Sequence, residues 1–580
     1  MDAAQHFAER DASGWSSEQI AAFLASHAAN DVSSFELDQD LHQVVRGDSV
    51  LGGELFDLHG SLVAVVTGES EDGASGIVAL HRQFHAGEIS SAHVANKSEP
   101  KFPVAFFGAR HGMATFAARL RVITYSLASM KPRLTAVPGS ILAPRGFKTA
   151  GVFCDIKRLG TGKGSNKGQK RDLTVIVSET PASVAGMFTT NQICAAPVKL
   201  CARRVRYGSG QAIVVNSGNA NACTGPQGLK DVTAMTARVA QLLRIPERSV
   251  FVGSTGRIGV NLPMENVLAG IDAVIPLLGS DLKRADEAAE AIMTSDTQPK
   301  QVAVEVMIDG HRIRIGGICK GAGMIQPGMS ATGARPAAFP QGLHATMLCF
   351  MTTDACIEPA GLQSALQEAV AQSFNRITID GDMSTNDTVL VLANGLSGNV
   401  SLKAREFPGT GKRAGNALIF QEALNHVCLA LAQMIVRDGE GVTRFVTVRV
   451  EGARSLSEAD AASRSVANSA LVKTSWHGGD PNWGRIIDAL GYSAARVVES
   501  KVDIGYSAPG SRKILWSLKK GKPTDASFRD LCAAVASKSF DLHIRLNLGR
   551  ASALMYAADL TEEYVEFNKG DVSDPTTLAG

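Results

Sequence analysis

A lysine, a glycine-rich turn and a threonine before an apolar stretch form the most reactive pattern in the 580-residue sequence. Lys320 begins KGAGMIQPGM (320–329), and Thr346 lies near the start of ATMLCFMTTDA (345–355). A threonine hydroxyl becomes a useful nucleophile only when a base lies beside it. Cleavage of the bond before Thr346 would supply one, because an α-amino group with a pKa of about 7.7–8.0 can accept the hydroxyl proton. Without further support, a structural threonine at a strand start is the commoner interpretation.

Two segments are rich in glycine and lysine, as phosphate-binding loops are: GTGKGSNKGQK (160–170) and GTGK (409–412). Such a loop needs the pattern GxxxxGK[ST], whose backbone N–H groups surround the phosphates. Neither segment has this pattern, because Arg413 follows Lys412 and no glycine occupies the required upstream position. We therefore expect both segments to be solvated loops, with no nucleotide site.

The composition is that of a globular protein with no strong overall field. Hydrophobic residues make up 45% and charged residues 20%, and 58 Lys+Arg against 56 Asp+Glu leave a net charge of +2. We therefore expect no nucleic-acid partner and no attraction to an anionic membrane. No apolar run reaches the roughly 18 residues of a membrane span. The nine cysteines include no CxxC pair, which predicts reduced thiols in an intracellular compartment and no structural zinc.

Residues 1–112 form an N-terminal extension to which we assign no role. A helix is expected over 17–28, and apolar runs occur at Leu51 and at 62–66. The extension is either an appended domain or upstream sequence joined in error by a gene model. At roughly 150 residues per domain, the whole chain has room for about three or four domains.

A basic segment, residues 113–134, separates this extension from the rest. No acidic residue occurs between Glu99 and Asp155, and Phe116, Leu120, Ile123 and Leu127 share one helical face. A segment that is basic, acid-poor and amphipathic is typical of an organelle transit peptide beginning at Met113. The alternative interpretation is a basic linker helix.

From about residue 135 onward the sequence predicts a mixed α/β fold. Asp309-Gly310 joins two alternating runs as a hairpin, which argues against a purely parallel sheet. The stretches at 443–452 and 540–549 alternate as strands with one exposed face. Further strands are expected at 173–179, 211–218 and 345–355, and helices at 229–245, 263–278, 359–374, 415–437 and 456–471.

Many segments in order, from about Pro138 to Ser573, resemble the ornithine acetyltransferase family of arginine biosynthesis, also called bifunctional glutamate N-acetyltransferase. The resemblance covers some three quarters of the chain. The matching segments are PRGFKTAGV (144–152), FTTNQICAAPV (188–198), NSGNANACTG (216–225), GSTGRIG (253–259), AIMTSDTQPK (291–300), KGAGMIQPGM, ATMLCFMTTDA, IDGDMSTNDT (379–388), DGEGVTR (438–444), LVKTSWHGGDPNWGR (471–485) and DLTEEYVEFN (559–568).

The resemblance implies a self-cleaving precursor with an α/β fold of layered sheets and helices. This fold is of the N-terminal-nucleophile type, like that of the related aminopeptidases. The scissile bond would join Ala345 to Thr346. Cleavage would give an α-chain region, residues 135–345, and a β-chain region, residues 346–580, which remain associated.

Catalytic roles follow from the family motifs. Thr346 would be the nucleophile that carries the acetyl group as an ester. Thr255 and Gly256 in GSTGRIG would form the oxyanion hole, through a hydroxyl and a backbone N–H. Glu440 would bind the substrate amine or hold the α-amine of Thr346. Without the family, GSTGRIG would be read as a turn and Glu440 as an ordinary loop acid.

Substrate-binding roles also follow from the resemblance. Lys320 would pair with a substrate carboxylate, and Thr294 would add a hydroxyl, although Ser295 replaces a second threonine usual at the next position. Asn568 would reach the substrate from near the C-terminus. Ser573 falls at the family's terminal Ser/Thr position, but the intervening KGDV departs from the family pattern.

The implied reaction is a ping-pong acyl transfer. The nucleophile takes acetyl from N2-acetyl-L-ornithine, releases L-ornithine and passes the acetyl to L-glutamate, giving N-acetyl-L-glutamate. Acetyl-CoA is a donor in some members, and no metal or bound cofactor is expected. The resemblance also implies a heterotetramer of two α and two β chains. With the basic segment it favours the mitochondrial matrix, with a plastid or the cytoplasm as alternatives.

Fifteen residues, 330–344, depart from the family pattern just before the scissile bond. They contain prolines and glycines typical of an irregular loop, and a second Ala-Thr pair, Ala331-Thr332. We expect Thr346 to be the nucleophile, because an apolar strand follows it and can fix its hydroxyl. The loop is expected to slow self-cleavage, which needs near-attack geometry. Alternatives are a related self-processing amidohydrolase or aminopeptidase, or an uncleaved inactive paralogue.

Overall fold

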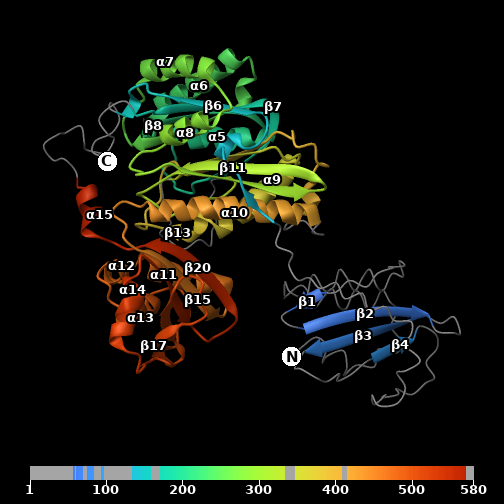
Figure 1. Cartoon of the computed structure of the whole chain (residues 1–580), viewed down its shortest axis with the longest axis vertical. Coiled ribbons are helices and arrows are strands. Elements are labelled where there is room, and N and C mark those ends of the chain that lie inside the picture. The colour runs from blue at the N-terminus through green and yellow to red at the C-terminus, as the bar shows by residue number, and fades with distance from the viewer. Residues whose placement is uncertain are drawn as a thin grey trace. The chain divides into compact units, whose positions relative to one another are not determined.

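The computed structural model describes residues 133–157, 170–332, 347–407 and 415–569, together with four strands between residues 56 and 96. The chain divides into two compact units, Met1–Ser126 and Leu127–Gly580. The helix expected over 17–28, the basic segment up to residue 132 and both lysine-glycine segments up to Gly168 and Lys412 lie outside the described residues. In the first unit the described strands form an antiparallel sheet of β1 (Phe56–Leu58), β2 (Ser61–Glu69), β3 (Ser75–Gln83) and β4 (His93–Asn96) (Figure 1).

The second unit is built around a nine-stranded mixed sheet. Its order is β5-β10-β11-β12-β14-β7-β8-β9, and β6 pairs with β7. The β8–β9 and β12–β14 pairs are parallel and the other pairs antiparallel, which confirms the expectation of a mixed α/β fold. The strands are β5 (Thr135–Ala136), β6 (Phe147–Val152), β7 (Leu173–Phe188), β8 (Ser209–Asn219), β9 (Val250–Arg257), β10 (Lys300–Ile308), β11 (His311–Lys320), β12 (Leu348–Thr353) and β14 (Thr388–Ala393).

The long strand β7 divides this sheet into two layers. Its first part pairs with β6 and β8, its last part pairs with β14, and the register shifts between Val177 and Ala182. Such an irregularity lets a strand bend from one layer into another. The layers face each other, because a Cβ on Gly253 of β9 would lie 2.7 Å from the ring of Phe350 in β12.

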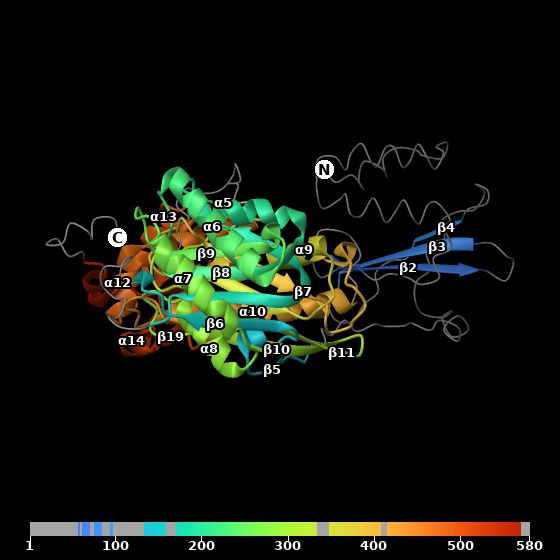
Figure 2. The same cartoon turned by 90° about the horizontal axis from the view of Figure 1, so that it is seen from above.

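Helices cover the outer faces of both layers, as Figures 1 and 2 show. On one layer α5 and α6 pack on β9 and α7 packs on β7, and on the other α9 packs on β7 and α10 on β10 and β11. The helix α8 instead packs on the inner face of β6, toward the other layer. The helices expected at 229–245, 263–278, 359–374 and 415–437 are confirmed to within a few residues. The observed bounds are α5 (Ala196–Arg204), α6 (Gly225–Leu243), α7 (Met264–Val274), α8 (Leu282–Ala291), α9 (Pro359–Gln372) and α10 (Gly415–Arg437).

The apolar run around β12 is continuous because both faces of the strand are buried. Leu348 and Phe350 point into the core between the two layers, together with residues of β7, β8 and β9. Cys349 and Met351 point to the other side, into the core beneath α9 and α10. Side chains alternate along a strand, so both sets must be apolar, as in other strands buried on both faces.

The expected hairpin at Asp309-Gly310 places Lys320 beside the start of β12. Both turn residues have positive φ, 51° and 77°, as a two-residue hairpin turn of type I′ requires. The β10–β11 pair runs in unbroken register to the end of β11. At that end, Lys320 is paired with Leu348.

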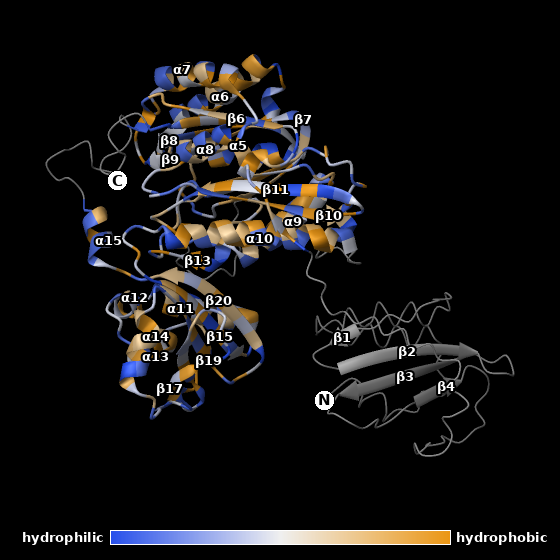
Figure 3. Cartoon of the chain, in the orientation of Figure 1, coloured by the Kyte–Doolittle hydropathy of each residue, from blue (hydrophilic) through white to orange (hydrophobic). Residues whose placement is uncertain are grey.

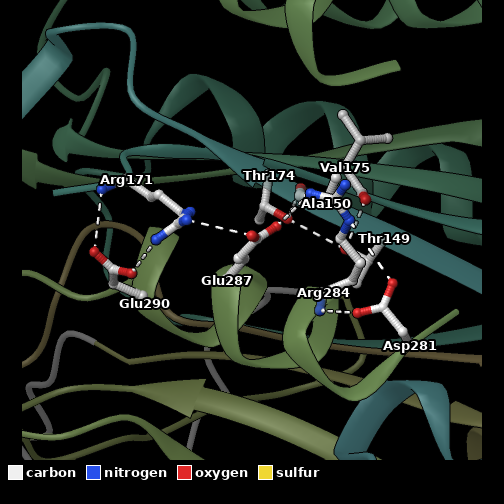
Figure 4. Close-up of polar contacts among 9 residues, drawn as sticks. All are labelled: Thr149, Ala150, Arg171, Thr174, Val175, Asp281, Arg284, Glu287 and Glu290. Atoms are coloured by element: carbon white, nitrogen blue, oxygen red, sulfur yellow. Dashed lines mark hydrogen bonds and ion pairs between the residues drawn. The ribbon is translucent and has the colours of Figure 1, made fainter. Parts of the chain in front are cut away.

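One helix, α8, packs on the face of β6 that points toward the other layer, and ion pairs join it to a residue just before β7. Arg171, just before β7, pairs with Glu290 at 2.7 Å and with Glu287 at 3.2 Å (Figure 4). Arg284 also pairs with Glu287, at 2.8 Å. The two Arg171 pairs join α8 to the start of β7, so the residues between α8 and β10 start from a fixed point.

Among the described residues one helix, α10, is long and apolar enough to cross a membrane by length and composition. Figure 3 shows its hydrophobic residues distributed along its length. Its buried side chains belong to the core that also contains residues of β11, β12 and α9. Within this fold α10 is therefore a core helix.

A second sheet of seven strands follows in the C-terminal part of the unit. Its order is β13-β20-β15-β19-β16-β17-β18, and α11 packs on β15 and β20. The helix expected at 456–471 is observed as two, α11 and α12. The elements are β13 (Ile377–Thr378), β15 (Phe445–Ala453), α11 (Leu456–Asn468), α12 (Ala470–His477), α13 (Trp483–Gly491), β16 (Asp503–Ser507), β17 (Leu515–Lys519), β18 (Lys522–Pro523), α14 (Phe528–Ala536), β19 (Ser539–Arg545), β20 (Ala551–Ala558) and α15 (Glu562–Phe567).

The expectation that β15 and β19 have one exposed face holds for only part of that face, where Glu451 is exposed and Arg449 and Arg545 are half-buried. Their polar residues Thr447, Asp541 and His543 are buried. Asp541 pairs with Arg449 at 3.0 Å, and His543 hydrogen-bonds Ser507 at 2.9 Å. Because these polar groups have partners, part of the second face can be buried at little cost. The alternation therefore marked one apolar face and one polar face that is buried over part of its length.

Candidate active site

The end of β9 presents a buried hydroxyl that has no partner. Thr255 pairs with Ser217 of β8 and is 0% exposed, and its Oγ1 has no hydrogen-bond partner among the described residues. Gly253, two residues earlier on the same face, lies against Phe350 of β12. Thr255 therefore faces the opposite layer. A buried hydroxyl without a partner is costly, which indicates a position where a bound group supplies the missing acceptor.

Gly256, next to Thr255, can only be glycine. Its φ is 129°, in the region that residues with a Cβ rarely adopt. A Cβ there would also overlap the backbone of Gly218 and Asn219 in β8. The two residues predicted as the oxyanion hole thus lie together at the end of β9, one with a free hydroxyl and the other with a tightly held backbone.

Lys320 is a buried residue of the site, which excludes the alternative of a surface lysine. Its side chain is 2% exposed at the end of β11, beside the start of β12. Its Nζ lies 4.0 Å from Oδ2 of Asp296. Burial lowers the pKa of Lys320, while Asp296, Glu440 and Asp387 oppose this decrease. These carboxyl groups therefore surround the ammonium.

A buried network of charges supports Lys320 and Thr294. Lys300 lies between Asp296, at 2.6 Å, and Asp438, and all three side chains are almost fully buried. Asp296 also accepts hydrogen bonds from the backbone N–H of Gly321, at 2.7 Å, and of Thr294, at 2.9 Å. Although burial opposes it, the two lysines hold the pKa of Asp296 well below its usual range. A carboxylate therefore fixes the segments on both sides of the site.

Glu440 is packed against the turn that follows Lys320. Its backbone N–H donates to Ala322 at 2.8 Å, and a Cβ on Gly323 would overlap its carboxyl group. The side chain accepts hydrogen bonds from Ser295 and Asn568. Burial raises the pKa of Glu440, and the two hydrogen bonds oppose this increase. Of the neighbours Thr294 and Ser295, it is thus Ser295 whose side chain contacts Glu440.

Asn568 reaches Glu440 across 128 positions of sequence. Its Nδ2 donates to Oε2 of Glu440 at 2.9 Å from the end of α15. The helix α15 is anchored by Thr561, which donates to the carbonyl of Gly441, and by Tyr564, which donates to Asp380. The structure therefore brings together Lys320, Glu440 and Asn568, as the sequence predicts.

Ala345, Thr346 and Ser573 lie outside the described residues, so their roles stay predictions. Met347 is the first described residue after Thr332. Its N–H donates to Oδ1 of Asp387 at 2.6 Å, and its carbonyl accepts from the N–H of Thr388 at 3.1 Å. The residue that follows Thr346 in the sequence is thus held on both its polar atoms. Thr332 of the second Ala-Thr pair is exposed.

Sequence reasoning missed the charged and amide residues that hold the site together. These are Asp296, Lys300, Asn386, Asp387 and Asp438. All five lie in AIMTSDTQPK, IDGDMSTNDT or DGEGVTR, segments that carried the family resemblance. The sequence feature that could have pointed to them is their position in the same segments as residues with predicted catalytic or binding roles. Which of them pair, and that they are buried, depends on contacts between distant segments.

The described residues contain no group of three or more His, Cys, Asp or Glu side chains arranged to hold a metal ion. All nine cysteines are free thiols. Burial raises the pKa of several, including Cys319 and Cys349 near the start of β12. These thiols therefore stay protonated and are poor nucleophiles.

The arrangement has the chemical groups that an acyl transfer between amino acids requires. Thr255 and Gly256 offer a hydroxyl and a backbone N–H to a developing oxyanion. Lys320 offers a cation to a carboxylate, and Glu440 offers an acceptor to an amine. These groups come from different strands and loops: Lys320 is paired with Leu348 at the start of β12, and Glu440 packs against the turn that follows Lys320.

Comparison with known proteins agrees with this chemistry. The sequence profile of the ArgJ family matches residues 151–570. The arginine biosynthesis bifunctional protein ArgJ of Symbiobacterium thermophilum is 43% identical over 432 residues, 74% of this chain and 98% of that protein. The glutamate N-acetyltransferase of Methanocaldococcus jannaschii is 40% identical over 440 residues, 75% of this chain and 99% of that protein. On these matches, the chain belongs to the ArgJ family.

Proposed function

We propose that this chain moves an acetyl group from N2-acetyl-L-ornithine to L-glutamate through an ester on Thr346. The nucleophile would be freed when the chain cuts itself between Ala345 and Thr346. The observation that carries the proposal is the buried hydroxyl of Thr255, which finds no hydrogen-bond partner within the described part of the chain and lies at a strand end facing the layer of β12. Similarity to relatives named glutamate N-acetyltransferase and arginine biosynthesis bifunctional protein supports the same chemistry.

The direction in which the side chains of β12 point supports Thr346 as the nucleophile. Leu348 points into the core between the layers, on the side where Thr255 lies. In an extended chain, a residue two positions before Leu348 has the same facing. A nucleophile at that position would therefore share a face with the donors of the oxyanion hole.

The transfer proceeds in two half-reactions. The α-amine of Thr346 takes the hydroxyl proton while Oγ1 attacks the acetyl carbonyl, and the oxyanion accepts from the Thr255 hydroxyl and the Gly256 N–H. The C–N bond then breaks, and the proton passes to the amine of the departing L-ornithine. The amine of L-glutamate attacks the ester, the C–O bond breaks, and the proton returns to the Thr346 hydroxyl.

Both substrates are amino acids, so one set of groups can bind each in turn. Lys320 pairs with the α-carboxylate, held in place by Asp296. Glu440 accepts from the substrate amine, or from the α-amine of Thr346, and Asn568 supports it. Thr294 and Ser573 add hydroxyl groups to the same pocket. No bound cofactor takes part, and acetyl-CoA is a second donor for L-glutamate.

The assembly and location follow from the same proposal. The two chains stay together as one folded unit, and two such units form a heterotetramer. The basic segment 113–134 directs the protein to the mitochondrial matrix. Sequencing the N-terminus of native protein tests this location, since a mature α chain that begins upstream of residue 113 would contradict it.

Mass spectrometry and a transfer assay test the central claim. The purified protein should contain a fragment that begins at Thr346 and should move labelled acetyl from N2-acetyl-L-ornithine to L-glutamate. Thr346→Ala should remove both cleavage and transfer, whereas Thr332→Ala, at the exposed threonine of the second Ala-Thr pair, should keep both. An intact 580-residue chain without activity would instead indicate an inactive paralogue. Acetyl release to water without L-glutamate would indicate an amidohydrolase.

A further inference from the structure

Two consecutive residues before β14 contact both halves of the proposed site. Asn386 donates through Nδ2 to the carbonyl of Ser254, at 2.8 Å, and to that of Ala220, at 2.6 Å. Asp387 accepts through Oδ1 from the N–H of Met347, at 2.6 Å. Neither residue has an assigned role in the transfer. We call this pair the Asn386-Asp387 clamp.

The Asn386 side holds the oxyanion hole. Ser254 directly precedes Thr255, and Ala220 donates its N–H to the carbonyl of Arg257 at 2.9 Å, on the far side of Gly256. One amide group therefore fixes the chain before Thr255 and the neighbouring strand that supports the chain after Gly256. Asn386 is 2% exposed, so water cannot readily replace these bonds.

The Asp387 side holds the start of β12. Its partner is the N–H of Met347, which belongs to the peptide bond that directly follows Thr346. The backbone carbonyl of Asp387 accepts from Thr189 at 2.9 Å, which fixes Asp387 to the end of β7. Its second carboxyl oxygen, Oδ2, is buried and has no hydrogen-bond partner among the described residues.

We propose that Asn386 and Asp387 are positioning residues that set the distance between the oxyanion hole and the strand carrying the nucleophile. This proposal rests on the proposed function, because it takes Thr346 as the nucleophile. The physical reason is that the two halves lie in different layers. Thr255 is at the end of β9 and Met347 before β12, and the clamp is one short, buried connection between them.

The charge state of Asp387 adds a prediction to this geometry. Burial raises the pKa of Asp387 well above its usual range, although the Met347 N–H and Lys320 oppose this increase. A protonated carboxyl has one acceptor oxygen and one O–H donor, and an asparagine amide has the same two functions in nearly the same shape. Asp387→Asn should therefore keep the clamp, whereas Asp387→Ala removes it.

The opposite ends of the same two strands offer matched controls. Asp354 follows β12 and accepts from the N–H groups of Arg314 and Arg145. Asn399 follows β14 and donates to the carbonyls of Cys356 and Val400. Both are buried or nearly so and lie away from Thr255. Substitution there removes comparable hydrogen bonds from the same strands without touching the clamp.

The experiment measures kcat and KM for both substrates, the cleaved fraction and the melting temperature in Asn386→Ala, Asp387→Ala and Asp387→Asn. Asn399→Ala and Asp354→Ala are the controls, and rates are divided by the cleaved fraction. We expect each clamp alanine variant to lose about 100-fold in kcat with little change in KM, as for a 1 Å misplacement of reacting groups. The controls should lose melting temperature but keep kcat, and Asp387→Asn should keep both.

Three results would overturn the proposal. The first is a clamp variant that loses no more kcat than its control, and the second is a loss confined to KM. The third is an inactive, well-folded Asp387→Asn, which would make Asp387 a proton acceptor in place of a positioning residue. Because Asp387→Asn keeps the shape of the side chain, it stays informative even where the alanine variants fail to fold. Failure of the proposed function is separate, since wild-type protein would then show no transfer.

Discussion

The two ends of the parallel pair β12–β14 differ in how their polar groups are satisfied. At the end that follows the strands, both carboxyl oxygens of Asp354 accept backbone N–H groups, and Asn399 donates to two carbonyls. At the end that precedes them, Asp387 uses one oxygen only and Thr255 in the other layer uses none, counting partners among the described residues. Asp354 and Asn399 thus have partners for their polar atoms, whereas within the described part of the chain Asp387 and Thr255 each keep an unpaired oxygen.

This difference distinguishes structural polar groups from functional ones. A buried polar group usually finds a partner, because leaving it unpaired costs free energy. A satisfied group such as Asn399 therefore needs no explanation beyond folding. An unpaired group such as Thr255 reduces stability, and it is explained when a substrate supplies the missing partner during the reaction.

The sharpest test compares Thr255→Val with Thr352→Val. Loss of the Thr255 hydroxyl should lower kcat by about 100–1,000-fold, the usual effect of removing one oxyanion donor. Its melting temperature should be unchanged or higher, because the variant no longer buries an unpaired hydroxyl. Thr352 donates to the carbonyl of Ile141 at 2.7 Å, so Thr352→Val should lose about 1 kcal/mol of stability and keep kcat. Equal kcat in the two variants would reject the oxyanion role.

The second test displaces Glu440 without removing it. A Cβ on Gly323 would overlap the Glu440 carboxyl, and Gly323 does not have positive φ, so Gly323→Ala adds a steric contact without backbone strain. Because the carboxyl ends a flexible side chain, it should move by about 1 Å and lower kcat/KM by up to about 100-fold. Gly478→Ala is the control, since the nearest atom there is 3.5 Å away. An unchanged kcat/KM would remove Glu440 from the substrate site.

Much of the fold follows from local sequence patterns. The hairpin at Asp309-Gly310 follows from two residues that tolerate positive φ between alternating runs. The helix α10 begins and ends where the periodicity predicts. The bend of β7 does not follow, because the polar stretch SETP (178–181) predicts the end of a strand, whereas the structure continues one strand from Leu173 to Phe188. Burial of Asp541 and His543 was also missed, since it depends on partners from distant strands.

The site divides in the same way. Thr255, Lys320 and Glu440 could be named because the family pattern assigns them, and the structure places all three around the start of β12. The Lys300 network and the clamp could not be named, since charge pairs between β10 and the end of α10 depend on the folded arrangement. Sequence reasoning identified the groups that we propose to touch substrate and missed the groups that hold them in place.

The third test uses pH to compare Asp387 with Asp354. Burial raises the pKa of both carboxyls, but two N–H donors oppose this increase at Asp354 and one at Asp387. The folded chain therefore keeps protons that the unfolded chain releases. The resulting stability is full below the ordinary pKa of Asp, about 3.9, and is lost as pH rises through the raised value, by about 1.4 kcal/mol per pH unit for each group.

Asp387→Asn should remove this pH-dependent loss of the free energy of unfolding, and should do so over a wider pH range than Asp354→Asn. Denaturant unfolding between pH 4 and 8 measures it, in a Thr346→Ala background where the chain stays intact, with all variants compared at one protein concentration. Equal slopes in wild type and Asp387→Asn would mean that Asp387 is ionised in the folded chain. The expectation that Asp387→Asn keeps full activity, which relies on a protonated Asp387, would then have no basis.

The smallest effect is expected from shortening the loop before the scissile bond. Ser330 forms two backbone hydrogen bonds with Phe188 at the end of β7, at 2.8 and 2.9 Å, and Ala331 packs against the core. A deletion should therefore begin at Gly333 and end at His344, so that these contacts are kept.

After the proposed cleavage the segment is only the tail of the α chain, so kcat should not change. Self-cleavage should be equally fast or faster, measured as the appearance of two bands on a denaturing gel. Abolished cleavage would mean that the loop itself helps to hold the Ala345 carbonyl, and the contrast between the two strand ends would then extend to the segment before β12.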